Sequence, residues 1–189
     1  MSESNAVSSK YLLVQGITLA RIPLAIAFSA VILNAPPQYE SPSIPLLLAC
    51  SALLAISEVS DFLDGFLARR LAVVSEWGAM LDPYSDSVSR LIVYWSLASA
   101  GLALSIVPLV MALRDVTVAY CRITWVRQGK SVSAKWSGKI KAVVQGVVAF
   151  VLLWNPAFAD TVGKGVAPFS WLVIAVTVYS ALDYLRPKK

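Results

Sequence analysis

Four aspartates stand close together in a chain that is otherwise mostly apolar: Asp61, Asp64, Asp82 and Asp86. The members of the first pair are three residues apart and those of the second pair four, so each pair lies on one face of its own helix. Two carboxylates about 4 Å apart repel one another by about 4 kcal/mol at an effective dielectric constant of about 20. A positive partner must sit between them, and a pair of hard divalent cations, Mg²⁺ or Mn²⁺, is the simplest candidate.

The residues around the aspartates suit a phosphate ligand. Gly65, Ala68 and Gly78 lack bulk, so a nucleotide or diphosphate can approach the backbone there. Arg69 offers a planar fork of donors to phosphate oxygens, and Arg90 is a candidate ion-pair partner for a carboxylate. Solvated helix ends would explain one aspartate, but not the small residues and the arginine at fixed offsets. The chain has no histidine, which excludes His-based catalysis and His-ligated zinc.

Membrane helices must position these side chains. Of the 189 residues, 58% are hydrophobic and 14% are charged, against about 25% charged residues in a soluble domain. The mean hydropathy is +0.70. We therefore predict an all-α, polytopic membrane protein that forms a single domain over residues 1–189. The net charge of +5 then indicates contact with anionic lipid headgroups and phosphorylated substrates, and not with nucleic acid.

Long runs without charged residues set the predicted helices, since a membrane span needs about 20 mostly apolar residues. The sequence predicts six transmembrane helices in one bundle, with a turn near Gly101 and an N-terminal cytoplasmic segment of residues 1–15. The predicted helices cover about 16–34, 43–70, 79–100, 105–128, 136–155 and 165–185. The distribution of lysine and arginine places both termini and the aspartates on the cytoplasmic side of the cell membrane.

A second group of residues is basic and is predicted to hold the phosphate of an acceptor substrate. Arg114 and Arg122 are eight residues apart on one predicted helix and therefore share a face. Single lysines at a membrane edge are common, but Arg114 lies deep in an apolar run, where charge is expensive and usually functional. Several cations beside a metal site favour glycerol 3-phosphate or inositol phosphate as the acceptor. The predicted acceptor-phosphate ligands are Thr18, Arg21, Arg114, Arg122, Lys135, Lys139 and Lys141.

The pattern D-x2-D-G-x2-A-R-x8-G-x3-D-x3-D, from Asp61 to Asp86, resembles the signature of the CDP-alcohol phosphatidyltransferase family. The resemblance implies a homodimeric six-helix membrane enzyme with two divalent cations, in which an alcohol displaces CMP from a CDP-linked substrate. It implies that Asp61, Asp64 and Asp82 bind metal, and that Asp86 is both a metal ligand and the general base. The implied CDP-lipid site consists of Asp61, Gly65, Ala68, Arg69 and Gly78.

The flanking motifs resemble the phosphatidylglycerophosphate synthase branch of this family. They are T-x2-R at Thr18, Arg114-Asp115 followed by Arg122, and G-K-x-K at Gly138. This resemblance implies CDP-diacylglycerol and glycerol 3-phosphate as substrates. Inositol phosphate, or phosphatidylglycerol as in a cardiolipin synthase, remain alternative acceptors. Two other classes also remain: a small cation transporter, which would need ionisable groups near the membrane midplane, and an inactive lipid-binding scaffold, against which the intact aspartate set argues.

Overall fold

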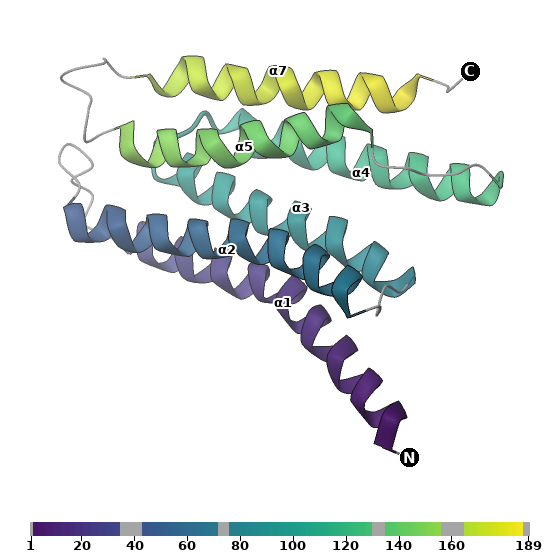
Figure 1. Cartoon of the computed structure of the whole chain (residues 1–189). Coiled ribbons are helices and arrows are strands. Elements are labelled where there is room, and N and C mark those ends of the chain that lie inside the picture. Colours follow the sequence, from purple (N-terminus) through teal and green to yellow (C-terminus); the bar gives the residue numbers. More distant parts are fainter. Residues whose placement is uncertain (1, 35–42, 72–75, 130–134, 156–164, 187–189) are drawn as a thin grey trace. The chain divides into compact units, whose positions relative to one another are not determined.

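The computed structural model describes residues 2–34, 43–71, 76–129, 135–155 and 165–186, without the side chains of residues 2–9, Ala68, Arg69, Glu76, Trp77 and Ala79. This part of the chain consists of helices and contains no strand (Figure 1), which confirms the all-α prediction. The helices are α1 Ser2–Leu33, α2 Ile44–Arg70, α3 Glu76–Ser99, α4 Ile106–Arg127, α5 Trp136–Trp154 and α7 Val166–Leu185. All begin and end within three residues of the predicted bounds, except that α1 begins at Ser2 and not at residue 16.

Four of the described helices are long and apolar enough to cross a membrane, over Lys10–Leu33, Ile44–Leu67, Trp136–Trp154 and Val166–Leu185. The helices α3 and α4 are not among these four, and each contains four charged residues. Large apolar side chains such as Leu48, Val147 and Trp171 are more than half exposed on the spanning helices, as expected for surfaces that face lipid. The protein is therefore a membrane protein, while the six-span bundle stays a prediction.

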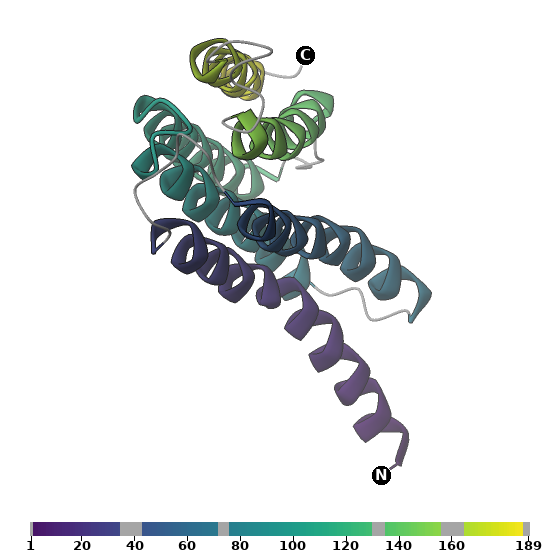
Figure 2. The same cartoon turned by 90° about the vertical axis from the view of Figure 1, so that its left-hand side faces the viewer.

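The described residues fall into two compact units. Unit 1 contains α1, α2 and the part of α3 up to Val93, and unit 2 contains the rest of α3 with α4, α5 and α7. In unit 1, α1 and α2 lie side by side (Figures 1 and 2). In unit 2, α7 packs against both α4 and α5.

The contact between α1 and α2 follows from a seven-residue repeat in both helices. On α1 the buried positions Val14, Thr18, Arg21, Ala25, Phe28 and Ile32 alternate at steps of four and three residues, with Gln15 also buried; this is the pattern of helices that pack lengthwise on one another. On α2 the buried positions are Leu47, Cys50, Leu54 and Asp64, and the half-buried Ser57 and Asp61 continue the same repeat between Leu54 and Asp64. One end of this seam is apolar, whereas the other end carries the charged residues. The same repeat that buries Phe28 thus also places Arg21 against the aspartates of α2.

A glycine closes α3 at the predicted turn. Gly101 has a positive φ of 74°, a conformation that favours glycine. Its N–H donates to the carbonyl of Ala98 at 3.0 Å, and the N–H of Leu102 donates to the carbonyl of Leu97 at 2.7 Å. This pair of bonds is the Schellman motif, which satisfies the last carbonyl groups of a helix. The predicted break near Gly101 is therefore confirmed.

Candidate functional site

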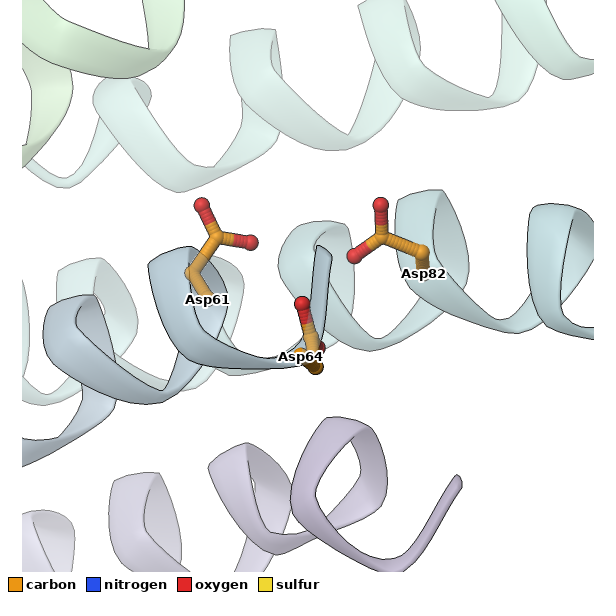
Figure 3. Close-up of side chains that lie close together, drawn as sticks. All are labelled: Asp61, Asp64 and Asp82. Atoms are coloured by element: carbon orange, nitrogen blue, oxygen red, sulfur yellow. The ribbon is translucent and has the colours of Figure 1, made fainter. Parts of the chain in front are cut away.

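The predicted metal ligands lie together in unit 1. Carboxylate oxygens of Asp61 and Asp64, on α2, and of Asp82, on α3, all lie within 4.8 Å of one another. Figure 3 shows the side chains of Asp61 and Asp82 turned toward one another from the two helices. The side chain of Asp64 is 5% exposed and that of Asp82 is 54% exposed, so a ligand can reach the cluster from the side of Asp82.

Arg21 from α1 is the central cation of this acidic cluster. Its guanidinium forms an ion pair with Asp61, and donates to Asp64 Oδ2 at 3.1 Å and to Asp82 Oδ1 at 2.6 Å. The carboxylate of Asp86 lies 3.9 Å from the same group. Because the Arg21 side chain is only 2% exposed, its charge is screened little by water. The guanidinium therefore offsets part of the repulsion among the four carboxylates.

Hydroxyl groups fix the deepest aspartate. Thr18 donates through Oγ1 to Asp64 Oδ2 at 2.8 Å. Asp64 therefore accepts hydrogen bonds from two residues of α1 one turn apart, Thr18 and Arg21. Ser85 on α3 donates to the backbone carbonyl of Thr18 at 2.5 Å. Since Ser85 is fully buried, this bond joins α3 to α1 beside the cluster. Thr18 and Arg21, both predicted as acceptor-phosphate ligands, are thus brought to the aspartates in unit 1.

A second arginine extends the cluster along α3. Arg90 donates through Nε to Asp86 Oδ1 at 2.6 Å, one helical turn away. Its guanidinium also lies 3.1 Å from Glu58 Oε1 on α2. The expected pairing of Arg90 with a carboxylate is confirmed, and it holds one oxygen of Asp86 in a fixed place.

The charges of the described side chains in this cluster do not balance. Five carboxylates, those of Glu58, Asp61, Asp64, Asp82 and Asp86, face the guanidinium groups of Arg21 and Arg90. Three negative charges remain. Clustered carboxylate oxygens with excess negative charge are the donor set that Mg²⁺ and Mn²⁺ prefer, so the residues present fit a divalent metal site.

The small residues of the motif flank the cluster on both helices. Gly65 follows Asp64 on α2, and Gly78 lies one turn before Asp82 on α3; both are half-buried. The side chains of Ala68 and Arg69 lie outside the described ones. The predicted role of these four residues in binding a nucleotide remains untested by the geometry.

The basic residues predicted on the fourth and fifth helices gather in unit 2. Arg114 on α4 donates through Nη1 to Asp115 Oδ1 at 2.8 Å and through Nη2 to Ser180 Oγ on α7 at 2.7 Å. Lys141 on α5 donates to the same Asp115 oxygen at 3.1 Å. Adjacent residues on a helix normally point in different directions. Here Asp115 nevertheless accepts hydrogen bonds from both cations, its sequence neighbour Arg114 on α4 and Lys141 on α5.

Arg122 and Lys135 complete this basic cluster around one tyrosine of α7. Arg122 donates through Nη2 to the hydroxyl of Tyr184 at 3.1 Å, and the backbone N–H of Lys135 donates to the same hydroxyl at 3.1 Å. The Lys135 ammonium also pairs with Asp183, whose carboxylate accepts from Ser137 Oγ at 2.6 Å. The prediction that Arg114 and Arg122 share a face is confirmed by their common contact with Tyr184.

The basic cluster has excess positive charge and buried hydrogen-bond donors without partners. Among its described side chains, four cations, Arg114, Arg122, Lys135 and Lys141, face the carboxylates of Asp115 and Asp183, which leaves two positive charges. The buried Nε groups of Arg114 and Arg122 and the buried Oδ2 of Asp115 have no hydrogen-bond partner in the described part of the chain. Buried donors of this kind normally have partners. Lys139 is exposed, and its ammonium lies 5.2 Å from the ring centre of Trp136.

The sequence motifs did not assign Glu58 or Tyr184 to either cluster. Glu58 stands one turn before Asp61 on α2, so the helical period could have indicated it. Tyr184 is far from the basic residues in sequence and reaches them only because α7 packs on α4 and α5. Local spacing carries no signal for such a contact.

The chain as a whole is similar to known membrane enzymes of lipid synthesis. Residues 11–181 match the family model described as CDP-alcohol phosphatidyltransferase. The chain is 30% identical to a CDP-diacylglycerol–glycerol-3-phosphate 3-phosphatidyltransferase of Pectobacterium atrosepticum, over 74% of this chain and 78% of the relative. It is 31% identical to proteins of the same name from Bacillus subtilis and Salmonella choleraesuis, over 89% of this chain and 90% of each relative. The protein therefore belongs to the CDP-alcohol phosphatidyltransferase family and is a membrane-bound transferase of phospholipid biosynthesis.

Proposed function

We propose that the protein transfers the phosphatidyl group of CDP-diacylglycerol to glycerol 3-phosphate, giving phosphatidylglycerophosphate and CMP. The relatives reported above carry the name of this activity. The observation that carries the choice of acceptor is the basic cluster in unit 2, with two excess positive charges and two buried arginine donors without partners. A phosphate monoester has about two negative charges near neutral pH and would satisfy both the charge and the donors.

In this proposal the nucleotide side of the reaction belongs to unit 1. Asp61, Asp64, Asp82 and Asp86 hold two divalent cations, Mg²⁺ or Mn²⁺. Gly65, Ala68, Gly78 and Arg69 accommodate the diphosphate of CDP-diacylglycerol. The clustering of three carboxylates within 4.8 Å supports the metal assignment. Arg21 offsets part of the repulsion among these carboxylates, and Thr18 donates to Asp64. Both residues also keep their predicted role as ligands of the acceptor phosphate.

The chemical step is a displacement at phosphorus. A hydroxyl oxygen of glycerol 3-phosphate attacks the phosphorus that carries diacylglycerol, and the bond from this phosphorus to the CMP oxygen breaks, so that CMP leaves with the electron pair. Asp86 accepts the hydroxyl proton, and Arg90, which donates to Asp86 Oδ1, holds the carboxylate in place. Bound divalent cations would neutralise the diphosphate and make the alcohol more acidic.

The acceptor side belongs to unit 2. Arg114, Arg122, Lys135, Lys139 and Lys141 bind the phosphate of glycerol 3-phosphate and orient its hydroxyl. The guanidinium groups of Arg114 and Arg122 suit this task because they can donate two parallel hydrogen bonds to phosphate oxygens.

The proposal includes a setting in the membrane. The chain crosses the cell membrane six times as a homodimer, with both termini and the reaction centre on the cytoplasmic side. The four apolar spanning helices support the setting in a membrane, and the distribution of lysine and arginine in the sequence supports the cytoplasmic side for the termini and the reaction centre. The six crossings come from the charge-free runs of the sequence, and the homodimer from the family resemblance. A cytoplasmic reaction centre would give the soluble substrate glycerol 3-phosphate direct access.

Release of CMP by the purified protein tests the proposal. CDP-diacylglycerol is supplied in detergent with Mg²⁺ or Mn²⁺, and the acceptor is glycerol 3-phosphate, inositol phosphate, phosphatidylglycerol, inositol or serine in separate reactions. We expect rapid CMP release with glycerol 3-phosphate and loss of activity with EDTA. Faster release with another acceptor would replace glycerol 3-phosphate, and metal-independent release would overturn the two-metal assignment.

A further inference from the structure

Tyr184 lies at the centre of the basic cluster, although its residue type binds neither metal nor phosphate by charge. Only 1% of the residue is exposed. It stands in the last turn of α7, and it contacts residues of α4 and residues at the start of α5. A buried tyrosine at the junction of three helices can serve as packing alone, so the question is what its polar and aromatic groups do.

The ring of Tyr184 faces several cations. The guanidinium carbons of Arg114 and Arg122 lie 5.3 and 5.6 Å from the ring centre, and the Lys135 ammonium lies 5.4 Å from it. These distances are within the range of about 6 Å over which a ring attracts a cation. Three positive groups around one site repel one another. The ring therefore helps to hold them in place before an anion binds.

The hydroxyl of Tyr184 fixes two of the same residues. It accepts hydrogen bonds from Arg122 Nη2 and from the backbone N–H of Lys135, both at 3.1 Å. The second bond ties the residue that precedes α5 to the end of α7. Loss of the hydroxyl would free the Arg122 guanidinium to adopt other rotamers, while the ring could stay in place.

Neighbouring residues keep the tyrosine in one orientation and leave space beside it. The Trp125 ring on α4 stacks on the Tyr184 ring, with 6.2 Å between centres and 13° between planes. A side-chain carbon added at Gly138 would lie 3.5 Å from the Tyr184 hydroxyl and 3.7 Å from Arg114 Nη2. The absence of a side chain at Gly138 thus keeps the approach to both polar groups open.

We infer that Tyr184 is a positioning residue for acceptor binding: it holds Arg114, Arg122 and Lys135 in the arrangement that receives the acceptor phosphate. The inference rests on the proposed function for the identity of that acceptor. Tyr184 would raise the affinity for the acceptor by fixing these cations, without contacting the reacting phosphorus itself. Preorganised donors lose less conformational freedom on binding, so the effect belongs in the KM for the acceptor and not in kcat.

Two substitutions separate the ring from the hydroxyl. Tyr184→Phe keeps the ring and removes the hydroxyl, whereas Tyr184→Leu removes both. The matched controls are Tyr179→Phe and Tyr179→Leu, because Tyr179 lies on the same helix and is 61% exposed. The measured quantities are kcat, KM for glycerol 3-phosphate, KM for CDP-diacylglycerol, and the inhibition constant of inorganic phosphate in competition with glycerol 3-phosphate.

We expect Tyr184→Leu to raise the KM for glycerol 3-phosphate by on the order of tenfold or more, since it removes several cation–ring contacts. Tyr184→Phe should raise it by about threefold, since one hydrogen bond to a charged donor is lost. Inhibition by inorganic phosphate should weaken in parallel. The KM for CDP-diacylglycerol and all constants of the Tyr179 variants should stay unchanged.

Other results for the Tyr184 variants would contradict the inference or limit it. Equal losses for both substrates, or a fall in kcat alone, would show a general structural role and overturn the inference, as would an unchanged acceptor KM. If Tyr184→Leu does not fold, Tyr184→Phe decides by the same criteria. If the wild-type enzyme uses another phosphorylated acceptor, the proposed function fails while the inference is tested on that acceptor; exclusive use of an acceptor without phosphate would overturn both.

Discussion

Replacing Arg21 by methionine tests the charge balance of the acidic cluster. Methionine keeps an unbranched chain of similar length but removes the charge. Because the Arg21 side chain is 2% exposed and pairs with Asp61, Asp64 and Asp82, its loss leaves carboxylates without their buried partner. Breaking a buried ion pair in this way costs about 3–5 kcal/mol. For a chain of this size the Tm should fall by roughly 6–20 °C in the absence of divalent cations.

Divalent cations should reverse much of this loss. A metal ion that binds only the folded protein stabilises it by about 2.7 kcal/mol at 100 times its Kd. The gain should be larger in the variant, since the Arg21 guanidinium no longer shares the carboxylate oxygens with the metal. The assay is thermal unfolding of the purified protein in detergent, with EDTA or with Mg²⁺. Arg127→Met is the control, because Arg127 is exposed at the end of α4 and belongs to unit 2, whereas the aspartates belong to unit 1. This variant should keep the Tm of the wild type in EDTA and gain the same stabilisation from Mg²⁺ as the wild type.

The opposite result would be a fall in Tm, relative to the wild type, that is the same in EDTA and in Mg²⁺. Arg21 would then stabilise the protein by packing and not by its charge. Titration of Mn²⁺ by calorimetry gives an independent measurement, with tighter binding expected for Arg21→Met than for the wild type. Weaker binding would mean that Arg21 orders the aspartates for metal and does not compete with it.

Three further substitutions address the two clusters and the core. Asp86→Asn should abolish CMP release while leaving metal-dependent binding of CDP-diacylglycerol; loss of binding as well would identify Asp86 mainly as a ligand. Arg122→Ala should raise the KM for glycerol 3-phosphate by on the order of tenfold, and an unchanged KM would remove Arg122 from the acceptor site. Phe28→Ala, at a fully buried position, should lower the free energy of unfolding by about 3–5 kcal/mol in denaturation measurements, with the KM values unaffected.

Composition and charge-free runs predicted the six described helices and all their ends except the start of α1. The ends of α2, α4, α5 and α7 lie close to the predicted positions because charged residues or proline follow or precede the apolar runs. The start of α1 could not be predicted in the same way. Residues 2–15 mix serine with charged and apolar residues, so no run of hydrophobic residues marks the first turns of that helix.

The motif spacing placed the aspartates correctly but not their partner. The i,i+3 and i,i+4 rule relates residues within one helix, and it correctly grouped Asp61 with Asp64 and Asp82 with Asp86. The neighbour of a side chain on another helix depends on how the two helices are aligned. Arg21 meets the aspartates because the buried repeat of α1 runs alongside that of α2. A basic residue in a T-x2-R motif gives no local sign of this contact.

The two clusters carry opposite excess charge, and under the proposed function this difference gives the two substrates different requirements for metal. The described side chains around Arg21 have three negative charges in excess, so an anionic diphosphate can approach them only if cations are bound. The described side chains around Tyr184 have two positive charges in excess and bury arginine donors, so under the proposed function a phosphate monoester would bind there without metal. Divalent cations should therefore control binding of the nucleotide lipid much more than binding of the acceptor. This asymmetry follows from the charges alone and does not depend on which phosphorylated alcohol the enzyme uses.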